Sequence, residues 1–262
     1  MDLQLHDRTV IVTAGSKGLG KASAVEFARE GANVVIASRD AGHLEQAKAD
    51  IASLTGKEAL TVQADVSRKE DTARVIRAAV GWTGRLDVLV TNAGGPPGGG
   101  FDQFGDDAWE AAFQQNLMSV VRLIREALPH MRLQGGGRIV NLTSVSVKQP
   151  IPDLILSNVF RAGVYALTKS LSAELGKDAI LVNTVGPGCI ETDRIRELDS
   201  RAAEQTGSTE EQVRSRLAAQ IPLGRYGTAE EFAKTIVYLG SFANTYVTGQ
   251  AVLVDGGMVR AL

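Results

Sequence analysis

Short runs of β-forming residues alternate with longer stretches of helical periodicity along the whole chain. Seven runs are typical of strands: Thr9–Thr13, Asn33–Ala37, Ala59–Gln63, Leu86–Thr91, Arg138–Asn141, Ile180–Asn183 and Ala251–Val254. Apolar residues recur at helical spacing in six further stretches: Leu19–Glu30, His43–Leu54, Lys69–Trp82, Asp107–Met131, Ser157–Leu175 and Ala229–Gly240. Several strand runs, such as Val34–Ala37, are nearly all apolar, which is typical of a parallel sheet covered on both faces.

This alternation predicts a single α/β domain over residues 1–262. The expected fold is doubly wound (Rossmann-type): a seven-stranded parallel sheet with helices on both faces and ligands at the carboxyl ends of the strands. A chain of 262 residues is long enough to bury most of its apolar surface without dividing into separate domains.

The charge of the chain restricts its partners. Lys and Arg number 28 against 30 Asp and Glu, and the net charge of −2 gives no bulk attraction to nucleic acid or to an anionic membrane. We therefore expect small-molecule partners and copies of the same chain, as a homo-oligomeric dimer or tetramer.

Cysteine and histidine are too sparse for a disulfide or a metal site. Cys189 is the single cysteine, and His6, His43 and His130 stand at no metal-ligand spacing. The first residues lack a basic segment with a long apolar core, and no run reaches the roughly 18 apolar residues of a membrane span. A cytoplasmic protein without a metal is expected.

A glycine-rich loop joins the first strand run to the first helical stretch. It contains Gly15, Ser16, Lys17, Gly18, Leu19 and Gly20. Glycines at this point let backbone N–H groups approach a pyrophosphate placed at the positive end of a helix. The alternative is a structural turn, but the strand–loop–helix context favours dinucleotide binding.

The end of the second strand run indicates which dinucleotide would bind. Ser38 and Arg39 follow Ala37, and no acidic residue is present there to hold a free ribose 2′-hydroxyl. Arg39 can instead bind a 2′-phosphate, with Lys17 as a second positive charge. NADP(H) is therefore preferred, and NAD(H) remains possible. The alternative is that both cations are solvated on exposed turns.

Further short motifs stand at or just beyond the ends of other strand runs. They are Asp65-Val66, Asn92-Ala93-Gly94, the segment Arg138–Ser144, the segment from Pro187 through Gly188 and Ile190 to Thr192, and Val247–Gly257. In this order they resemble the short-chain dehydrogenase/reductase family over nearly the whole chain. The amino-acid sequences of the loops most resemble those of β-ketoacyl carrier-protein reductases and small sugar-alcohol dehydrogenases.

The resemblance implies roles for individual residues. Ser144 matches the serine that polarises the substrate oxygen, and Asn116 matches the asparagine that holds a water; the alternative for Asn116 is a solvent-facing residue of a helix. Residues 193–223 match the substrate lid, and Val213, Leu217 and Ile221 indicate an amphipathic helix within it. The cofactor contacts implied are Asp65, Val66, Asn92, Ala93, Gly94, Arg161, Pro187, Gly188, Ile190 and Thr192, with Arg161 placed to bond the ribose hydroxyls.

The chain departs from the family at its catalytic pair. Family members place a Tyr thirteen residues after the serine and a Lys four residues further on, where this chain has Ser157 and Arg161. Tyr165 and Lys169 repeat the spacing, but eight residues too late. On a helix that shift moves a side chain about 12 Å along the axis and turns it by about 80°. Tyr165 is therefore interpreted as a helix-packing residue.

Three hypotheses follow from this substitution. A serine hydroxyl lacks the reach and acidity of a phenol, and a guanidinium with a pKa of about 12.5 or more relays protons poorly. The favoured hypothesis is an NADP(H)-dependent oxidoreductase acting on a carbonyl or alcohol, in which Ser144 polarises the oxygen. A water near Ser157 and Arg161, or another side chain, then supplies the proton. The others are a non-catalytic dinucleotide-binding protein, acting as a sensor or assembly partner, and an enzyme that uses Tyr165 and Lys169.

Overall fold

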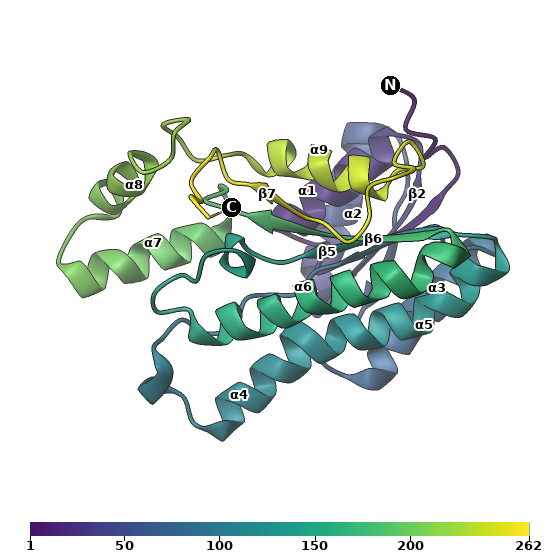
Figure 1. The fold of residues 1–262 in the computed structure, drawn as a ribbon. Helices are drawn as coiled ribbons and strands as arrows, with labels where there is room; N and C mark the ends of the chain where they lie inside the picture. The colour runs from purple at the N-terminus through teal and green to yellow at the C-terminus, as the bar shows by residue number, and fades with distance from the viewer. Residues whose placement is uncertain (262) are drawn as a thin grey trace.

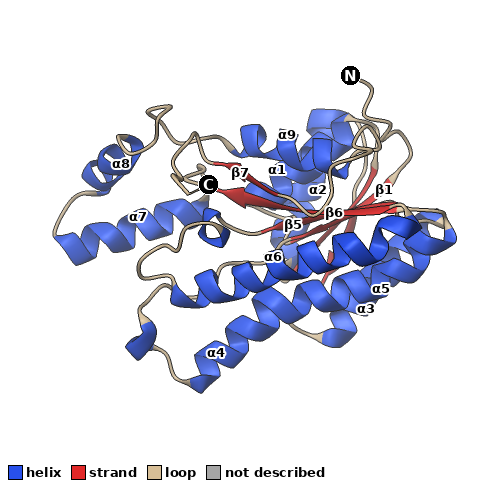
Figure 2. Ribbon diagram, viewed as in Figure 1, coloured by secondary structure: helices blue, strands red, loops and turns tan. Residues whose placement is uncertain are grey.

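In a computed structural model, which describes residues 1–261, one parallel sheet runs through the centre of the molecule (Figure 2). The strand order is β3-β2-β1-β4-β5-β6-β7. The strands are β1 (Thr9–Thr13), β2 (Asn33–Ser38), β3 (Leu60–Gln63), β4 (Val88–Thr91), β5 (Gly137–Leu142), β6 (Ile180–Pro187) and β7 (Ala251–Val254). All the neighbouring pairs are parallel, and the predicted fold class is confirmed.

Helices cover both faces of this sheet (Figure 1). One layer holds α1 (Gly18–Arg29), α2 (Ala41–Thr55) and α9 (Ala229–Gly240), and the opposite layer holds α3 (Lys69–Thr83), α5 (Ser119–Leu133) and α6 (Ile155–Leu175). Three more helices lie near the cleft end of the sheet: α4 (Asp106–Phe113), α7 (Asp193–Thr206) and α8 (Glu210–Ala218).

Alternation along the strands explains the two layers. Val10 and Val12 of β1 pack into the cluster with Phe27 and Phe232, whereas Ile11 packs into the cluster with Leu123. All six side chains are buried. Because successive side chains of a strand point to opposite faces, a nearly continuous apolar run supplies both cores at once.

The order of the strands positions the ligand cleft. The chain builds outward from β1 to β2 and β3 on one side, then returns to β4 on the other, so that β1 pairs with both β2 and β4. A doubly wound sheet opens a crevice beyond the carboxyl ends of the strands where the order reverses. The loops after β1 and β4 therefore face one another there.

Three elements differ from the sequence-based prediction. The stretch Asp107–Met131 is not one regular helix, because a π-helical turn at Gln114–Met118 separates α4 from α5. β6 continues beyond Asn183 to Pro187 because its last residues, which include Gly186 and Pro187, pair with β7. The predicted amphipathic helix ends at Ala218, and Ile221 lies in the turn that follows it.

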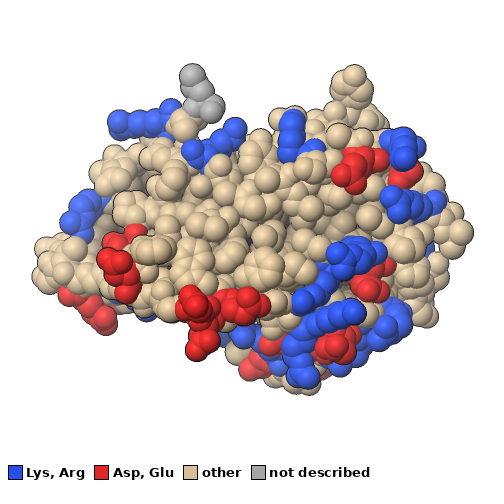
Figure 3. Space-filling view, turned by 60° about the horizontal axis from the view of Figure 1, so that its bottom comes forward, with Lys and Arg blue, Asp and Glu red and all other residues tan. Residues whose placement is uncertain are grey.

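The surface shows no concentration of one charge on the face drawn in Figure 3, where basic and acidic side chains are interspersed. This agrees with the net charge of −2. Within residues 1–261, no helix is both long and apolar enough to cross a membrane.

Candidate active site

A cavity of about 1210 Å³ lies at the carboxyl ends of the strands. Its wall brings together most of the residues singled out in the sequence. They are Ser16, Lys17, Gly18, Leu19, Ser38, Arg39, Asp65, Val66, Asn92, Ala93, Gly94, Ser144, Ser157, Arg161, Pro187, Gly188, Ile190 and Thr192. Gly15, Gly20 and Asn116 do not line this cavity.

Gly15 and Gly20 have a structural reason to be glycine. A Cβ at Gly15 would lie 2.8 Å from the carbonyl oxygen of Val12, and one at Gly20 would collide with the carbonyl oxygen of Ala14. Both glycines therefore let the loop and the start of α1 pack against the end of β1. Direct contact of either residue with a cofactor remains a prediction.

Ala14 adopts a backbone conformation that usually requires glycine. Its φ is +45°, in the left-handed region that an L-residue enters at a cost of about 1–2 kcal/mol. Gly18, further along the loop, has a φ of +50°. The chain thus passes twice through left-handed geometry here, at Ala14, which has a Cβ, and at Gly18, the first residue of α1.

The far end of the cavity carries the groups expected to hold an adenosine. The Lys17 and Arg39 side chains are exposed and both residues line the wall, so their charges are available to a ligand. The Asp65 carboxylate accepts hydrogen bonds from the backbone N–H of Ser67 at 3.0 Å and from its hydroxyl at 2.7 Å. These bonds fix the orientation of Asp65 at the end of β3.

Ser144 stands at the opposite end of the cavity, just beyond β5. It precedes a 3₁₀ turn at Val145–Val147, and its Oγ accepts a hydrogen bond from the backbone N–H of Ser146 at 3.1 Å. The hydroxyl hydrogen of Ser144 is not used in that bond. Ser144 can therefore donate to an oxygen atom of a ligand in the cavity.

Asn116 lies behind the wall, in the π-helical turn between α4 and α5. Its Nδ2 donates to the carbonyl oxygen of Gly94 at 3.0 Å, so it supports the loop after β4. Its Oδ1 is buried and has no hydrogen-bond partner within residues 1–261. A buried acceptor without a protein partner is a natural position for an ordered water. Asn116 is buried, contrary to the solvent-facing alternative.

Arg161 reaches the cavity from α6, one helical turn after Ser157. Its Nη1 donates to the carbonyl oxygen of Leu142 at 2.9 Å and its Nη2 to that of Ala93 at 3.5 Å. Burial, followed by the positive charge of Arg194, lowers the pKa of Arg161 to about 10. The guanidinium consequently remains charged at neutral pH.

Tyr165 and Lys169 lie away from the cavity. Tyr165 is half-buried, with the Nζ atom of Lys148 located 5.7 Å from the centre of its ring. Lys169 is exposed, and its Nζ donates to the carbonyl oxygen of Gly249 at 3.4 Å. Neither residue lines the site that contains Ser144.

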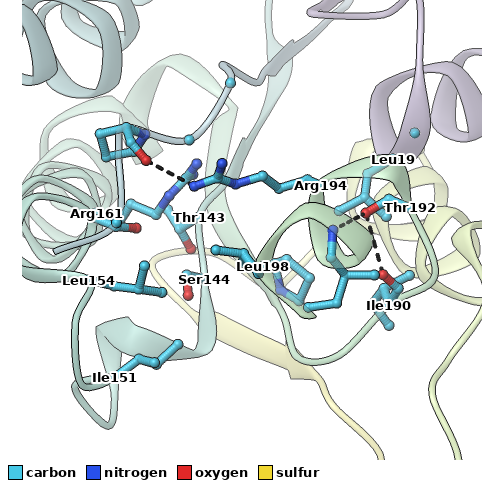
Figure 4. A pocket seen from close by; sticks show the side chains of 18 of the residues that line it. Leu19, Thr143, Ser144, Ile151, Leu154, Arg161, Ile190, Thr192, Arg194 and Leu198 are labelled. Atoms are coloured by element: carbon cyan, nitrogen blue, oxygen red, sulfur yellow. Dashed lines mark hydrogen bonds between the residues drawn. The ribbon is translucent and has the colours of Figure 1, made fainter. Parts of the chain in front are cut away.

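Helix α7 closes over the glycine-rich loop 94–100. Arg194 Nη2 donates to the carbonyl oxygen of Pro96 at 2.9 Å, and Arg201 Nη1 donates to that of Gly98 at 3.1 Å (the Arg194 contact is drawn in Figure 4). Two arginines from the helix thus hold the loop through its backbone. Arg194 also lines the cavity.

Sequence reasoning missed a buried pair in the same region. The Tyr226 hydroxyl donates to the Asp199 carboxylate, with distances of 3.3 and 3.2 Å to its two oxygens, and Asp199 lines the cavity. Burial raises the pKa of Asp199, and burial with the charge of Asp199 raises the pKa of Cys189 to about 11. No motif marks these residues, because Asp199 and Tyr226 are 27 residues apart in the sequence and come together only in the folded chain.

The fold and this site define a dinucleotide-binding protein of the oxidoreductase type. The chain belongs to the short-chain dehydrogenase/reductase family: residues 13–259 match the family model described as enoyl-(acyl carrier protein) reductase. It is 33% identical over 253 residues to the 3-oxoacyl-[acyl-carrier-protein] reductase FabG of Staphylococcus aureus, covering 96% of this chain and 98% of that protein.

Solved structures share the whole architecture. L-sorbose reductase from Gluconobacter frateurii, complexed with NADPH and L-sorbose, is 32% identical with a TM-score of 0.95, and the match covers 100% of both chains. Actinorhodin polyketide ketoreductase with NADPH is 31% identical with a TM-score of 0.92, over 96% of this chain and 97% of that one. The predicted family membership is confirmed.

Proposed function

We propose that this protein is an NADP(H)-dependent oxidoreductase that interconverts a small-molecule carbonyl and an alcohol by hydride transfer. The observation that carries the proposal is that one cavity is lined both by the dinucleotide motifs and by Ser144, Ser157 and Arg161. In the direction of reduction, one hydride and one proton convert the carbonyl to the alcohol.

The residues present fit a nicotinamide dinucleotide. The loop after β1 lines the cavity at the start of α1, where backbone N–H groups and the helix dipole favour a pyrophosphate. Gly18 places no side chain in that cradle, and Lys17 and Arg39 provide charge for a 2′-phosphate. The cofactor, when bound, supplies or accepts the hydride. NADPH in the two similar structures supports NADP(H) as the preferred cofactor, with NAD(H) possible.

The side chains at the reacting end have distinct roles in this proposal. Ser144 donates a hydrogen bond to the substrate oxygen, and the charge of Arg161 stabilises negative charge that develops on that oxygen. A water near Ser157, with the buried Oδ1 of Asn116 behind the wall, supplies the proton. Residues 193–223 serve as the substrate lid, and copies of the chain form a homo-oligomer.

Asp199 is the second candidate for the proton source. It lines the same cavity, and burial raises the pKa of its carboxyl group, which favours a protonated form at higher pH than for an ordinary aspartate. An Asp199→Asn variant that keeps the pH profile of kcat unchanged assigns the proton to water. Loss of the titrating step in that variant assigns it to Asp199.

The alternative function is non-catalytic binding of the dinucleotide. It is favoured by the sequence spacing, which matches Ser157 and Arg161 to the positions of the family Tyr and Lys. A site with these residues can hold the cofactor while lacking a phenolic acid.

One experiment distinguishes the two functions. The purified protein is incubated with NADPH and a panel of ketones, aldehydes and quinones, and the loss of reduced-nicotinamide absorbance is followed; NADPH binding is measured separately by calorimetry. Turnover supports the oxidoreductase. Binding without turnover across the panel, with activity gained in the double variant Ser157→Tyr and Arg161→Lys, supports the non-catalytic function.

A further inference from the structure

Tyr226 lies where the proposed lid meets the rest of the molecule. It follows the lid in the sequence and is 4% exposed. Its hydroxyl donates to the Asp199 carboxylate on α7, and the Cζ atom of Arg214 on α8 lies 4.6 Å from the centre of its ring. One side chain therefore contacts both of the helices that Figure 1 shows projecting beyond the sheet.

The backbone next to Tyr226 is bound to the loop after β6. The N–H of Gly227 donates to the carbonyl oxygen of Cys189 at 3.0 Å, and the carbonyl oxygen of Gly227 accepts from the N–H of Glu191 at 2.9 Å. The two bonds form a short parallel bridge on either side of Ile190, which lines the cavity. Tyr226 is thus one residue away from a direct partner of the loop that is proposed to contact the cofactor.

The bond to Asp199 sets which face of α7 turns toward the cavity. Asp199 is 5% exposed, and among residues 1–261 the hydroxyl of Tyr226 is the only donor to its carboxylate. Ile195, Leu198 and Ala202, which share one face of α7, line the cavity. Because each residue turns a helix by about 100°, a fixed Asp199 also fixes the direction of this apolar face.

α8 is connected to the same loop by an ion pair. Arg214 pairs with Glu191, the residue whose N–H donates to Gly227. This pair is exposed, and exposed ion pairs contribute little by themselves. The buried bond between Tyr226 and Asp199 is the firmer connection, since loss of either partner leaves the other polar group buried without its hydrogen bond.

We propose that Tyr226 is a positioning residue that joins the lid to residues 189–191, so that lid and loop move as one unit. This inference rests on the proposed function, in which that loop contacts the cofactor. A ligand that orders the loop then also orders α7 and α8. Coupling between two sites is reciprocal, so a loosened lid weakens the binding of the same ligand. NADPH binding and lid closure are therefore linked through one hydroxyl group.

The test measures hydrogen exchange in the lid with and without NADPH, and the dissociation constant of NADPH by calorimetry. In the wild type we expect NADPH to slow exchange in residues 200–218 by at least fivefold. In Tyr226→Phe, which loses only the hydroxyl, the slowing should fall below twofold and the dissociation constant should rise at least threefold. Tyr238→Phe is the matched control, because Tyr238 is exposed on α9 and does not line the cavity.

Two variants of Asp199 examine the same bond from its other end. Asp199→Leu removes the bond without leaving an unpaired carboxylate, so it replaces Tyr226→Phe if that variant folds poorly. We expect it to lose the NADPH-dependent slowing as well. Asp199→Asn keeps an oxygen that accepts from Tyr226 and should retain the slowing within twofold of the wild type. Equal loss in the Leu and Asn variants contradicts a role for this hydrogen bond.

Three outcomes overturn the inference. Unchanged lid exchange in Tyr226→Phe shows that Tyr226 does not hold the lid. Faster lid exchange by the same factor with and without NADPH, at an unchanged dissociation constant, reduces Tyr226 to a structural anchor with no link to the cofactor. Lid exchange that bound NADPH does not slow in the wild type shows that lid and loop are independent.

Failure of this inference is distinguishable from failure of the proposed function. Turnover of a carbonyl compound from the panel, without NADPH-dependent slowing of exchange in the lid, overturns the coupling alone. Slowing that Tyr226→Phe removes, without turnover of any compound in the panel, overturns the oxidoreductase alone.

Discussion

The hydroxyl of Ser16 donates a hydrogen bond to the hydroxyl of Ser38, with 2.9 Å between the oxygens. This bond joins the loop after β1 to the end of β2, on which Arg39 is the next residue. The loop proposed to hold the pyrophosphate and the cation proposed to bind the 2′-phosphate are therefore held at a fixed position relative to each other.

Arg39→Ala is expected to weaken NADPH much more than NADH. Hydrogen bonds to charged groups contribute about 1.5–3 kcal/mol, so the preference for NADPH should fall by about tenfold to a hundredfold. Dissociation constants for both cofactors provide the measurement. Arg29→Ala, at the exposed end of α1, is the control. An unchanged NADPH/NADH ratio in Arg39→Ala would show that Arg39 is only a solvated surface cation.

Ser144→Ala is expected to lower kcat by about 100- to 1000-fold, the range seen when a donor to a developing oxyanion is removed. The dissociation constant of NADPH should stay the same, because the hydroxyl lies at the substrate end of the cavity. Steady-state kinetics and calorimetry are compared with Ser170→Ala, an exposed serine of α6. Equal turnover in Ser144→Ala and the wild type contradicts the role assigned to Ser144.

Tyr165→Phe and Lys169→Gln should each retain at least about half of the wild-type kcat, since neither residue lines the cavity and surface substitutions change stability by only about 0.5 kcal/mol. The decisive quantity is kcat on any substrate found in the panel. A loss of about 100-fold or more in Tyr165→Phe would instead make Tyr165 the proton donor.

Ala14→Gly is expected to stabilise the fold. Removing the Cβ relieves about 1–2 kcal/mol of left-handed strain. The greater freedom of glycine in the unfolded chain lowers the stability of the fold by about 0.4–1 kcal/mol. Urea unfolding should show a net gain of about 0.5–1 kcal/mol. Ala166→Gly, on an exposed turn of α6, is the control and should lose about 1 kcal/mol. A decrease in unfolding free energy in both Ala14→Gly and Ala166→Gly would mean that Ala14 carries no strain.

Glu231 makes the stability of the fold depend on pH in the acidic range. The hydrogen bond from Arg225, followed by that from the backbone of Thr228, lowers its pKa from 4.5 to about 2. A carboxylate with a lowered folded-state pKa contributes stability above its unfolded pKa and loses it as the pH falls. The wild type should exceed Glu231→Gln in unfolding free energy above pH 4.5, with the difference vanishing as the pH approaches 2.

Urea titrations between pH 7 and pH 3 test this, with Glu230→Gln as the neighbouring control. Because Glu231 is exposed, the difference should also shrink at high salt. A difference that stays constant down to pH 3 would contradict the assignment.

The sequence was sufficient for the sheet and for most of the cavity wall. Apolar runs such as Val34–Ala37 are continuous because each strand is covered by helices on both faces, so they identify the strands of the sheet. Motifs such as Asn92–Gly94 lie directly after strand ends, where the cavity forms. The extension of β6 to Pro187 was missed because Gly186 and Pro187 are weak strand formers and are held by pairing with β7, a contact between distant segments.

Other features had no local signal. The bond from Asn116 to Gly94 joins a π-helical turn to a loop 22 residues earlier, and helix propensity contains no information about it. Asp199 and Tyr226 meet although 27 residues separate them in the sequence. The sequence also could not predict that the buried Arg161 lies near a second positive charge. Only the folded cavity brings Arg161 and Arg194 together.

The π-helical turn at Gln114–Met118 sets the phase between two halves of what would otherwise be one helix. Before it, Trp109 and Phe113 on α4 pack against Phe160, each with ring centres 5.9 Å from that ring. After it, α5 packs into the core below the sheet. Each residue turns a helix by about 100°, so a one-residue deletion here would rotate one of these faces out of contact. Loss of a single codon in this segment should therefore be tolerated far less well than exchange of any one of its side chains.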